Sequence, residues 1–395
     1  MKIGIEARVL ILNERGISNY ISNLIGQLAK IDKKNEYFIY VNSERHHTID
    51  KKKAEQIVKT LSKHKNITIR NIKSKNDFLW EQIYLPFKVL KDRIDVLHMT
   101  SNRSPLFVKC KLISTVHDVI EFELIEEKLK INNKLEKGTP IWKALLFEFR
   151  IPYRYHQKYM GTYIKLMYKN TFRKNDMVLT ISKKSKKDIQ KRLNVNPNKI
   201  KIIHHGIEND FKNKKTEKKY IMSFGGTMKH KNPEGCVESY SFLPSTYKEK
   251  YPLLIVGAEN PSEWEKILKK YNIKNYIING FVPRNELIQL YNKSKVFLFL
   301  SVIEGFGFPP LEAMACGTVP LVYNVGPMKD NVGSKEFCVD FKNNKQVAER
   351  ITELIDNKKK YKNLVSYGLR RSKEFSWEKC AASHLNAYKK VCNSD

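Results

Sequence analysis

The sequence has few cysteines and no long apolar run. Its six cysteines, at positions 110, 236, 316, 338, 380 and 392, form no C-x-x-C pair and no metal-like spacing, so a reducing, cytoplasmic setting is favoured over a disulfide framework or a zinc site. No 18 apolar residues run together, and the opening "MKIGIEARVLILNERG" lacks the apolar core of a signal peptide. The chain is therefore expected to be neither secreted nor membrane-spanning, and any membrane role is expected to be peripheral.

Acidic residues are scarce relative to basic ones. There are 41 Asp and Glu against 73 Lys and Arg, a formal charge of +32, and the net charge is +21 over residues 1–200 but +11 over 201–395. A field of this sign attracts polyanions, anionic lipid and phosphorylated small molecules. Since no helix-turn-helix, zinc or RRM-type pattern occurs, nucleic acid is not the expected partner, although a basic nucleic-acid-binding protein stays open as an alternative.

The length of 395 residues exceeds what one hydrophobic core usually serves, which is about 250–300 residues. Short β-rich runs alternate with helical patterns, pause in a charged stretch and then alternate again, which predicts two doubly wound α/β domains with parallel sheets. The expected strands lie at 2–7, 37–42, 67–72, 94–99, 112–118, 177–182 and 200–206, and then at 220–226, 253–259, 276–282, 296–302 and 319–326.

Four segments follow from this alternation. We expect an N-terminal domain over 1–205, a linker over 206–219, a second domain over 220–374 and a C-terminal helix over 375–395 that packs back on the first domain. In open parallel sheets, ligands bind outside the carboxyl ends of the strands. The loops that follow the strands are therefore where functional residues are expected.

The stretch "VFLFLSVIEGFGFPPLEAMACG" (296–317) joins a buried strand to a helix that Gly317 ends. The glycines of the intervening turn let a ligand approach the backbone, and free amides at Gly305, Phe306, Gly307 and Phe308, with the helix dipole, favour a phosphate. The flanking carboxylates, Glu304 and Glu312, suit the hydroxyls of a ribose or sugar. The alternative is that Glu304 is an ordinary surface residue and that Glu312 interacts favourably with the dipole of the helix.

This stretch resembles the E-x7-E signature of the retaining glycosyltransferases of family 4, which adopt the GT-B fold, an α/β architecture of two Rossmann-like domains facing across a cleft. The resemblance spans nearly the whole chain. It continues in "RGISNYISNLI" (15–25), "TVHDVIEFE" (115–123), "LTISKKSKKDI" (179–189), "HHGIEND" (204–210), "GGTMKHKN" (225–232) and "FSWEKCA" (375–381).

In the second domain, the resemblance implies a site for a nucleoside diphosphate sugar. Glu312 would hold the ribose hydroxyls and Glu304 the hydroxyls of the transferred sugar. Lys231 would neutralise the diphosphate as a point charge. Phe281 and Val282, after the strand "YIIN", match the place where family members hold the base by backbone contacts.

In the first domain, the resemblance implies two further contacts. Gly16 opens the first helix and would let its loop approach the donor phosphates, while His117 of "TVHD" would reach the sugar or the reacting centre. The alternative for His117 is a buried histidine with a structural role. His204 and His205 are expected to be structural.

The sequence departs from the family pattern in two places. Where many members place an arginine on the diphosphate, this chain has Gly225, Gly226 and Thr227, and Lys229 is a candidate substitute. Where the first-helix loop usually has a second glycine, this chain has Ser18.

The resulting hypothesis is a retaining transfer of a hexose from a UDP- or GDP-linked sugar to a glycan or lipid-linked acceptor in cell-surface polysaccharide synthesis. No D-x-D triplet occurs, so neither a metal nor another tightly bound cofactor is expected. No glycosidase-like carboxylate pair accompanies the motifs, which favours front-face attack. The open alternative within the same fold is a nucleotide-sugar epimerase.

A lysine-rich stretch with interleaved aromatic residues, 139–174, occurs where acceptor-facing elements lie in the family. Lysines beside aromatic residues suit an anionic membrane surface. The expected location is therefore cytoplasmic, with peripheral contact to the inner face of the membrane. The alternative is a solvated helix pair whose tyrosines pack on the core.

Overall fold

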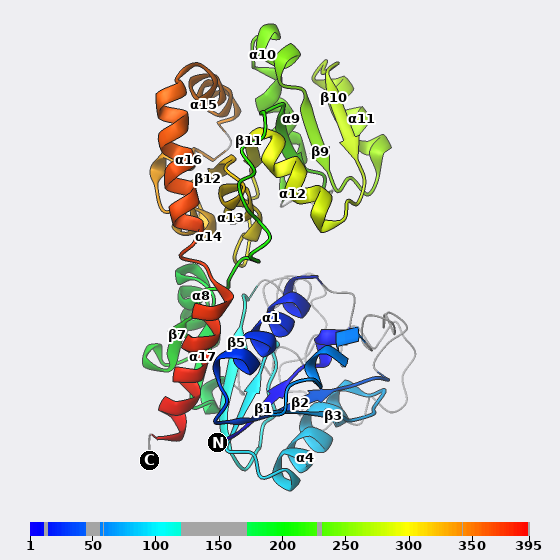
Figure 1. The fold of residues 1–395 in the computed structure, drawn as a ribbon, viewed down its shortest axis with the longest axis vertical. Coiled ribbons are helices and arrows are strands. Elements are labelled where there is room, and N and C mark those ends of the chain that lie inside the picture. The colour runs from blue at the N-terminus through cyan, green and yellow to red at the C-terminus, as the bar shows by residue number, and fades with distance from the viewer. Residues whose placement is uncertain are drawn as a thin grey trace, which may run out of the picture. The chain divides into compact units, whose positions relative to one another are not determined.

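The computed structural model describes residues 1–11, 15–44, 56–57, 59–119, 172–226, 231–341 and 343–393. The chain forms two units, one of Met1–His205 with Trp377–Asp395 and one of Gly206–Ser376 (Figure 1). Each unit is built on one parallel sheet, so the predicted α/β architecture is confirmed. The basic aromatic stretch at 139–174 lies almost entirely outside the described residues.

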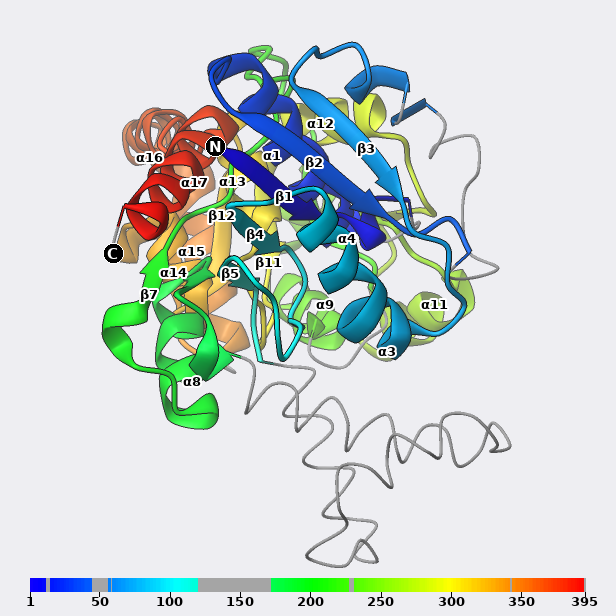
Figure 2. The ribbon, with the colours of Figure 1, turned by 90° about the horizontal axis from the view of Figure 1, so that it is seen from below.

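Unit 1 has a seven-stranded sheet in the order β3-β2-β1-β4-β5-β6-β7, which can be followed in Figure 2. All neighbouring strands pair in parallel. Each expected strand is present. Its last residue is the predicted one or lies a few residues before it. The strands are β1 (Lys2–Glu6), β2 (Glu36–Val41), β3 (Ile67–Asn71), β4 (Val96–Met99), β5 (Lys111–Val116), β6 (Met177–Thr180) and β7 (Ile200–Ile202).

The helices of unit 1 connect these strands. They are η1 (Arg8–Ile11), α1 (Arg15–Ile31), α3 (Asp77–Leu79), the π-helical η2 (Trp80–Tyr84), α4 (Leu85–Lys91), α8 (Lys183–Leu193), η3 (Pro197–Lys199) and α17 (Trp377–Cys392). Helix α1 begins at Arg15, one residue before Gly16, which the sequence expected to open the helix. The first-turn amides of a helix have no intrahelical partner, so a glycine there costs little.

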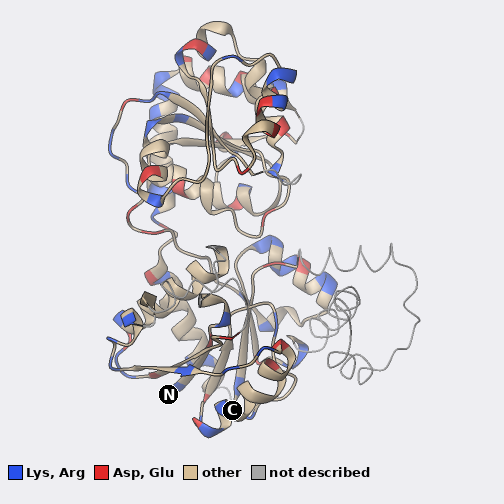
Figure 3. Cartoon of the chain, turned by 90° about the vertical axis from the view of Figure 1, so that its right-hand side faces the viewer, with Lys and Arg blue, Asp and Glu red and all other residues tan. Residues whose placement is uncertain are grey.

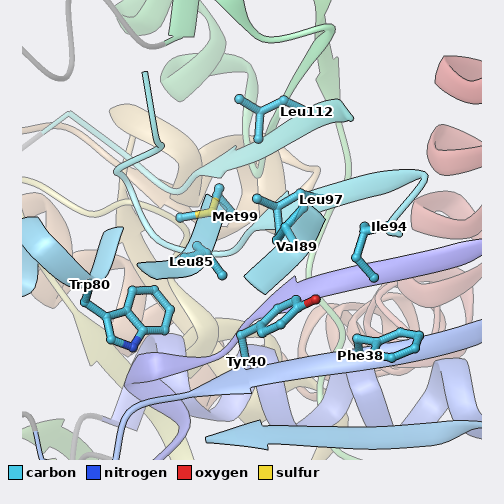
Figure 4. Close-up of a cluster of buried hydrophobic side chains, with 9 residues drawn as sticks. All are labelled: Phe38, Tyr40, Trp80, Leu85, Val89, Ile94, Leu97, Met99 and Leu112. Atoms are coloured by element: carbon cyan, nitrogen blue, oxygen red, sulfur yellow. The ribbon is translucent and has the colours of Figure 1, made fainter. Parts of the chain in front are cut away.

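One core of unit 1 lies between α4 and the sheet. Leu85 and Val89 on the inner side of α4, with Trp80, pack against the strand residues Leu97 and Met99 (Figure 4). All five side chains are buried. The i, i+4 spacing of Leu85 and Val89 places them on one helix face, and that face covers the sheet.

Unit 2 has a six-stranded sheet in the order β10-β9-β8-β11-β12-β13. Its five expected strands are present, and the sixth, β13, has only two residues, too few for a periodic pattern to reveal. The strands are β8 (Tyr220–Phe224), β9 (Leu253–Val256), β10 (Tyr276–Asn279), β11 (Ser294–Phe299), β12 (Val319–Tyr323) and β13 (Cys338–Val339).

The helices of unit 2 are α9 (Pro233–Ser241), α10 (Ser245–Lys250), α11 (Pro261–Lys270), α12 (Arg284–Lys293), α13 (Phe308–Ala315), α14 (Gly326–Val332), η5 (Lys335–Phe337), α15 (Asn344–Asp356) and α16 (Lys358–Ser372). Residues 206–219, which the sequence placed in a linker, lie along unit 2. The Asn292 side chain donates to the carbonyl of Lys212 and accepts from the amide of Lys214 at 3.0 and 2.6 Å.

Basic residues are spread over both units among acidic ones, without forming a single stripe across the part of the chain that the structure describes (Figure 3). Within that part, no helix combines the length and the apolar character that crossing a bilayer requires.

A chain of buried hydrogen bonds ties α17 to the rest of unit 1. The hydroxyl of Tyr388 lies 2.7 Å from Nδ1 of His98, whose Nε2 lies 2.8 Å from the hydroxyl of Thr115. That hydroxyl is 3.0 Å from the hydroxyl of Tyr20, which is 2.9 Å from Nε2 of His384. The chain joins α17, β4, β5 and α1 through side chains that are at most 2% exposed.

The contact of His384 with a backbone carbonyl decides which group donates in each of these hydrogen bonds. Nδ1 of His384 lies 2.8 Å from the carbonyl of Cys380, and a carbonyl only accepts, so Nδ1 carries the proton and Nε2 accepts from Tyr20. Thr115 must then donate to Tyr20, and His98 to Thr115. Every imidazole in the chain is neutral, in keeping with burial, which lowers the pKa of His384 to about 4 and that of His98 well below its usual value.

We expect unit 1 to lose stability as the pH falls from 6.5 towards 4. The folded pKa values of His384 and His117 are about 4, against an ordinary value near 6.5, so the unfolded chain binds more protons in this window. Each histidine then contributes up to about 3 kcal/mol to the free energy of unfolding. This contribution is present above pH 6.5 and is lost as the pH falls towards 4. Urea unfolding at a series of pH values, followed by a brief deuterium pulse at one common pH, measures this in peptides from α1 and α17.

The matched pair for this measurement is His384→Gln and His64→Gln, because His64 lies outside the hydrogen-bond chain. The first variant should weaken the pH dependence of the urea midpoint in α17 and the second should preserve it. A midpoint that does not change with pH in the wild-type chain would contradict the assignment.

Candidate active site

The turn between β11 and α13 contains a glycine in the left-handed backbone region. Gly307, which precedes the first residue of α13, has φ +85°, and a Cβ added there would lie 3.2 Å from Cγ of Met328. The Asn331 side chain donates to the carbonyl of Phe306 at 2.6 Å. The predicted helix is present: α13 begins at Phe308, next to the proline pair, and ends before Gly317, the predicted stop, which has φ +71°. The predicted order of strand, glycine turn and helix is therefore confirmed.

Lys231 and Glu304 lie in direct contact in this region. Their Nζ and Oε1 atoms are 2.7 Å apart, with side chains 30% and 14% exposed. They follow β8 and β11, which are neighbours in the sheet, so parallel pairing brings residues that are 73 positions apart to the same edge. The ammonium group also lies 5.9 Å from the ring centre of Phe299.

Glu312 lies one turn into α13 and is partly buried. Tyr291 donates to its Oε2 at 3.1 Å. Burial and the negative charge of Glu208 raise the pKa of Glu312 to about 7, against the opposing effects of Tyr291 and Arg284. The carboxyl group is therefore close to half protonated near neutral pH, and Tyr291, which the sequence did not reveal, is its hydrogen-bond partner.

Phe281 and Val282 follow β10, which β9 and β8 separate from β11 in the sheet. Phe281 is 68% exposed, and Val282 is partly exposed. The amide of Gly257, after β9, donates to the carbonyls of Asn279 and Gly280 at 3.0 and 2.9 Å, which fixes the backbone ahead of Phe281. The residues expected in unit 2 therefore follow strands whose carboxyl ends share one edge of the sheet, and Lys231 and Glu304 are joined there by a hydrogen bond.

His117 lies at the carboxyl end of β5 in unit 1 with both ring nitrogens engaged. Its Nε2 lies 2.9 Å from the carbonyl of Thr100, which fixes the proton there, and its Nδ1 then accepts from Nε2 of His205 at 3.3 Å. Burial lowers the pKa of His117 to about 4, so the ring is neutral near pH 7. His117 is 6% exposed. This burial agrees with a structural role for the histidine, and it also agrees with a ligand contact made through the small exposed area.

Gly16 lies in the first turn of α1, exposed, with no atom within 4 Å of an added Cβ. One turn along the same helix, the ring of Tyr20 meets that of His117 edge-on at 5.0 Å. The structure thus brings the start of α1 and the end of β5 together in unit 1. Ser18, at the place of the second family glycine, is buried and donates to the carbonyl of Leu10 at 3.4 Å.

The missing arginine after β8 has a steric explanation at one position. A Cβ added to Gly225 would lie 2.6 Å from the backbone nitrogen of Ala258, a distance that real contacts do not show, so position 225 has no room for a longer side chain. Thr227 and the suggested substitute Lys229 lie outside the described residues.

A buried ion-pair network at the end of β1 was not foreseen. Glu6 accepts from Nε of Arg8 at 2.9 Å, and Nη2 of Arg8 donates to Glu81 at the same distance. Burial alone would raise the pKa of Glu6, but the charge and hydrogen bonds of Arg8 hold it below the usual value. The guanidinium group stacks 4.5 Å from the ring centre of Trp80. The sequence signal was two opposite charges in the otherwise apolar run "IGIEARVL".

Two family models match the chain almost end to end. Glycosyltransferase Family 4 matches residues 15–211, and Glycosyl transferases group 1 matches residues 207–371. The chain belongs to the family 4 glycosyltransferases. The resemblance drawn from the E-x7-E stretch is thereby confirmed.

Curated relatives of this family 4 chain include bacterial mannosyltransferases. The serotype-specific mannosyltransferase WbdA of Escherichia coli is 29% identical over 180 residues, which is 44% of this chain and 22% of WbdA. The O-antigen chain mannosyltransferase B of Escherichia coli is 26% identical over 252 residues, 60% of this chain and 66% of that protein. The chain thus spans less than two thirds of the length of these relatives, and only about a fifth of WbdA.

Solved structures share the fold over the full chain. Anabaena HepE in complex with UDP and glucose superimposes with a TM-score of 0.66 at 13% identity, covering 99% of this chain and all of HepE. WaaG, a glycosyltransferase involved in lipopolysaccharide biosynthesis, gives a TM-score of 0.63 at 14% identity and full coverage of both chains. The family 4 chain therefore has the GT-B fold.

We expect Gly225→Ala to destabilise unit 2, because its Cβ would overlap the backbone of Ala258. Overpacking of this kind typically costs about 1–3 kcal/mol. Gly280→Ala is the matched control, since its nearest atom, the carbonyl oxygen of the same Ala258, lies 3.8 Å away. Urea unfolding of unit 2 peptides by deuterium labelling should show a lower midpoint for Gly225→Ala alone. Equal midpoints in the two variants would show that the backbone contact does not restrict position 225.

Proposed function

We propose that this chain transfers a hexose, with retention, from a nucleoside diphosphate sugar to a glycan or lipid-linked acceptor in cell-surface polysaccharide synthesis. The observation that carries the proposal is the contact of Lys231 with Glu304 beside the glycine-led start of α13. An ammonium group and a carboxylate group meet there, close to the amino end of a helix. Those are the groups that a diphosphate joined to a sugar requires.

The diphosphate would replace Glu304 as the partner of Lys231. The diphosphate carries two negative charges, against one for a carboxylate, and would also accept from the amides of Gly305–Phe308, so it competes for the same ammonium group. Glu304 is then free to accept hydrogen bonds from the hydroxyls of the transferred sugar. The 2.7 Å contact thus keeps both residues in place before the donor binds.

The rest of the donor would be held by four further contacts. Glu312, positioned by Tyr291, accepts from the ribose hydroxyls, and the backbone at Phe281 and Val282 holds the base. From unit 1, Gly16 lets the loop approach the phosphates. His117 is neutral at pH 7, so it would contribute a hydrogen bond to the sugar and no charge. To do so it must break its hydrogen bond with Thr100 or the one with His205.

The proposed chemistry is a front-face displacement. The bond between the anomeric carbon and the phosphate oxygen breaks, the acceptor hydroxyl attacks from the same side, and the departing phosphate oxygen takes the hydroxyl proton. Lys231 and the α13 amides stabilise the leaving diphosphate. Neither a metal nor another bound cofactor is proposed. Within the described residues, no three His, Cys, Asp or Glu side chains form a candidate metal cluster.

The names of related proteins guide the choice of donor. Several relatives are called mannosyltransferases, which makes GDP-mannose the first donor to test, and HepE has been solved with UDP-glucose, which makes it the second. We place the reaction in the cytoplasm, at the inner face of the membrane, where nucleotide sugars and lipid-linked acceptors meet.

The proposal predicts slow hydrolysis of one nucleotide sugar and its acceleration by an acceptor. Glu304→Ala should reduce donor turnover by about 100-fold or more, since charge-assisted contacts made in the transition state are worth a few kcal/mol. Glu265→Ala removes an exposed carboxylate on α11 and should leave turnover unchanged. Release of nucleoside diphosphate across a panel of UDP- and GDP-sugars measures both.

Five outcomes would contradict parts of this proposal. No turnover of any sugar nucleotide, or equal activity in Glu304→Ala and Glu265→Ala, would overturn the site. Conversion of the donor to its epimer without acceptor would indicate an epimerase. An inverted anomer in the product, or a trapped covalent glycosyl enzyme, would exclude the front-face mechanism.

Donor affinity should rise with pH between about 6 and 8, because ribose hydroxyls donate to the ionised form of Glu312. The pKa of this carboxyl group is about 7 before the donor binds, so binding releases a proton below that pH. Titration calorimetry with the intact sugar nucleotide, whose diphosphate does not titrate in this range, measures the trend. Glu312→Gln should remove it, and Tyr291→Phe, which removes a bond that lowers the pKa, should move it to higher pH. A wild-type affinity that stays constant over the range would refute the role of Glu312.

A further inference from the structure

A separate apolar surface lies on unit 1 around α4, and we call it the α4 surface. Five large hydrophobic side chains make it, and they are 43% to 77% exposed: Ile83, Tyr84, Phe87, Leu90 and Phe107. They account for five of the twelve large hydrophobic side chains that are exposed in the described part of the chain. Single exposed apolar residues are ordinary, but a contiguous group indicates a contact with something outside the chain.

The α4 surface is not needed to build the core. Leu85 and Val89 already cover the sheet (Figure 4), whereas Ile83, Phe87 and Leu90 recur at i, i+4 and i+7 and form a second apolar stripe. Phe87 and Leu90 are 69% and 50% exposed. A helix this short that serves only to cover a sheet would carry polar residues on its outer side.

A hollow of about 640 Å³ separates α4 from the segment that leads into β5. Phe87 and Leu90 line it on one side, and Leu106, Phe107 and Val108 line it on the other. Helix α4 ends before the amino end of β4, and Phe107 precedes the amino end of β5. Within unit 1, the α4 surface therefore lies towards the amino ends of the strands, whereas His117 lies at a carboxyl end.

Basic side chains surround the α4 surface. Lys174 places its Nζ 4.4 Å from the ring centre of Phe107, and Lys109 and Lys91 are exposed beside Phe107 and Leu90. Among the described residues, none of these three lysines forms an ion pair with a carboxylate. The acid lining the hollow, Asp176, accepts from the amide of Leu112 at 2.7 Å.

We propose that the α4 surface docks on an anionic lipid bilayer. Exposed aromatic and aliphatic side chains enter the boundary between headgroups and acyl chains, while lysines at their rim meet the anionic headgroups. A second copy of this chain fits less well, because the same surface on both partners would set Lys109 and Lys174 against equal charges. This surface is distinct from the stretch 139–174 for which the sequence predicted membrane contact, apart from Lys174.

Vesicle flotation of the full chain tests the proposal without any donor or acceptor, so its failure would leave the proposed transfer reaction intact. The chain should float with vesicles of phosphatidylcholine mixed with phosphatidylglycerol, bind pure phosphatidylcholine more weakly, and be released by salt. Phe87→Ser with Phe107→Ser should weaken binding to the mixed vesicles by about tenfold or more. Both residues are exposed, so the variant is expected to fold.

Matched controls separate this surface from the general positive charge. Lys109→Glu with Lys174→Glu should weaken binding by about tenfold or more, whereas Lys266→Glu with Lys274→Glu, exposed on unit 2, changes the net charge equally and should have little effect. Phe242→Ser, at 51% exposure, is the control for the aromatic change. Circular dichroism of each variant verifies that it is folded.

Three results, two from flotation and one from light scattering, would overturn the proposal. The first is vesicle binding that falls equally in the α4 surface variants and in their controls, and the second is vesicle binding that is absent from the wild-type chain. The third is a monomer–dimer equilibrium, measured by light scattering, that Phe87→Ser with Phe107→Ser abolishes, which would assign the surface to a second copy.

Discussion

Burial of both faces of each parallel sheet is the constraint on which the rest of the structure depends. Strands such as β4, β9 and β12 are buried at every residue, so their central positions are filled by apolar side chains, with few exceptions such as His98. Ligand-binding residues are therefore expected after the strands, and parallel pairing carries those residues to a common edge. Lys231 and Glu304 meet for this reason, although 73 positions separate them.

The same constraint explains how much the sequence could predict. Runs of β-branched and aromatic residues marked every strand except β13, which is too short to produce a pattern. The strand, glycine turn and helix around Glu304 and Glu312 are local in sequence, so the turn, the start of α13 and its end at Gly317 could all be placed. Family membership followed from the same local motif.

What could not be predicted depends on contacts between distant segments. Nothing around Tyr291 indicates that its hydroxyl reaches Glu312, because that contact requires the packing of α12 against α13. The ring of His117 could be placed at a strand end, but its bonds to Thr100 and His205 depend on two other loops. The exposed stripe on α4 was likewise invisible, since a helix that is apolar on two sides reads in sequence as a buried one.

The hydrogen-bond chain from Tyr388 to His384 has a consequence for the order in which the polypeptide acquires its structure. Unit 2 is continuous in sequence, whereas unit 1 needs α17, which follows unit 2 along the chain. During synthesis the residues of unit 2 are all available before α17 emerges from the ribosome, so the second half of the molecule can complete its fold while the first still lacks a helix. Until then Tyr20 and His98 lack their partners His384 and Tyr388 on α17, and unit 1 exposes the apolar surface that this helix covers. Unit 1 is thus synthesised first and completes its fold last. Between the synthesis of its first 205 residues and the arrival of α17, this strongly basic chain most needs protection from misassembly.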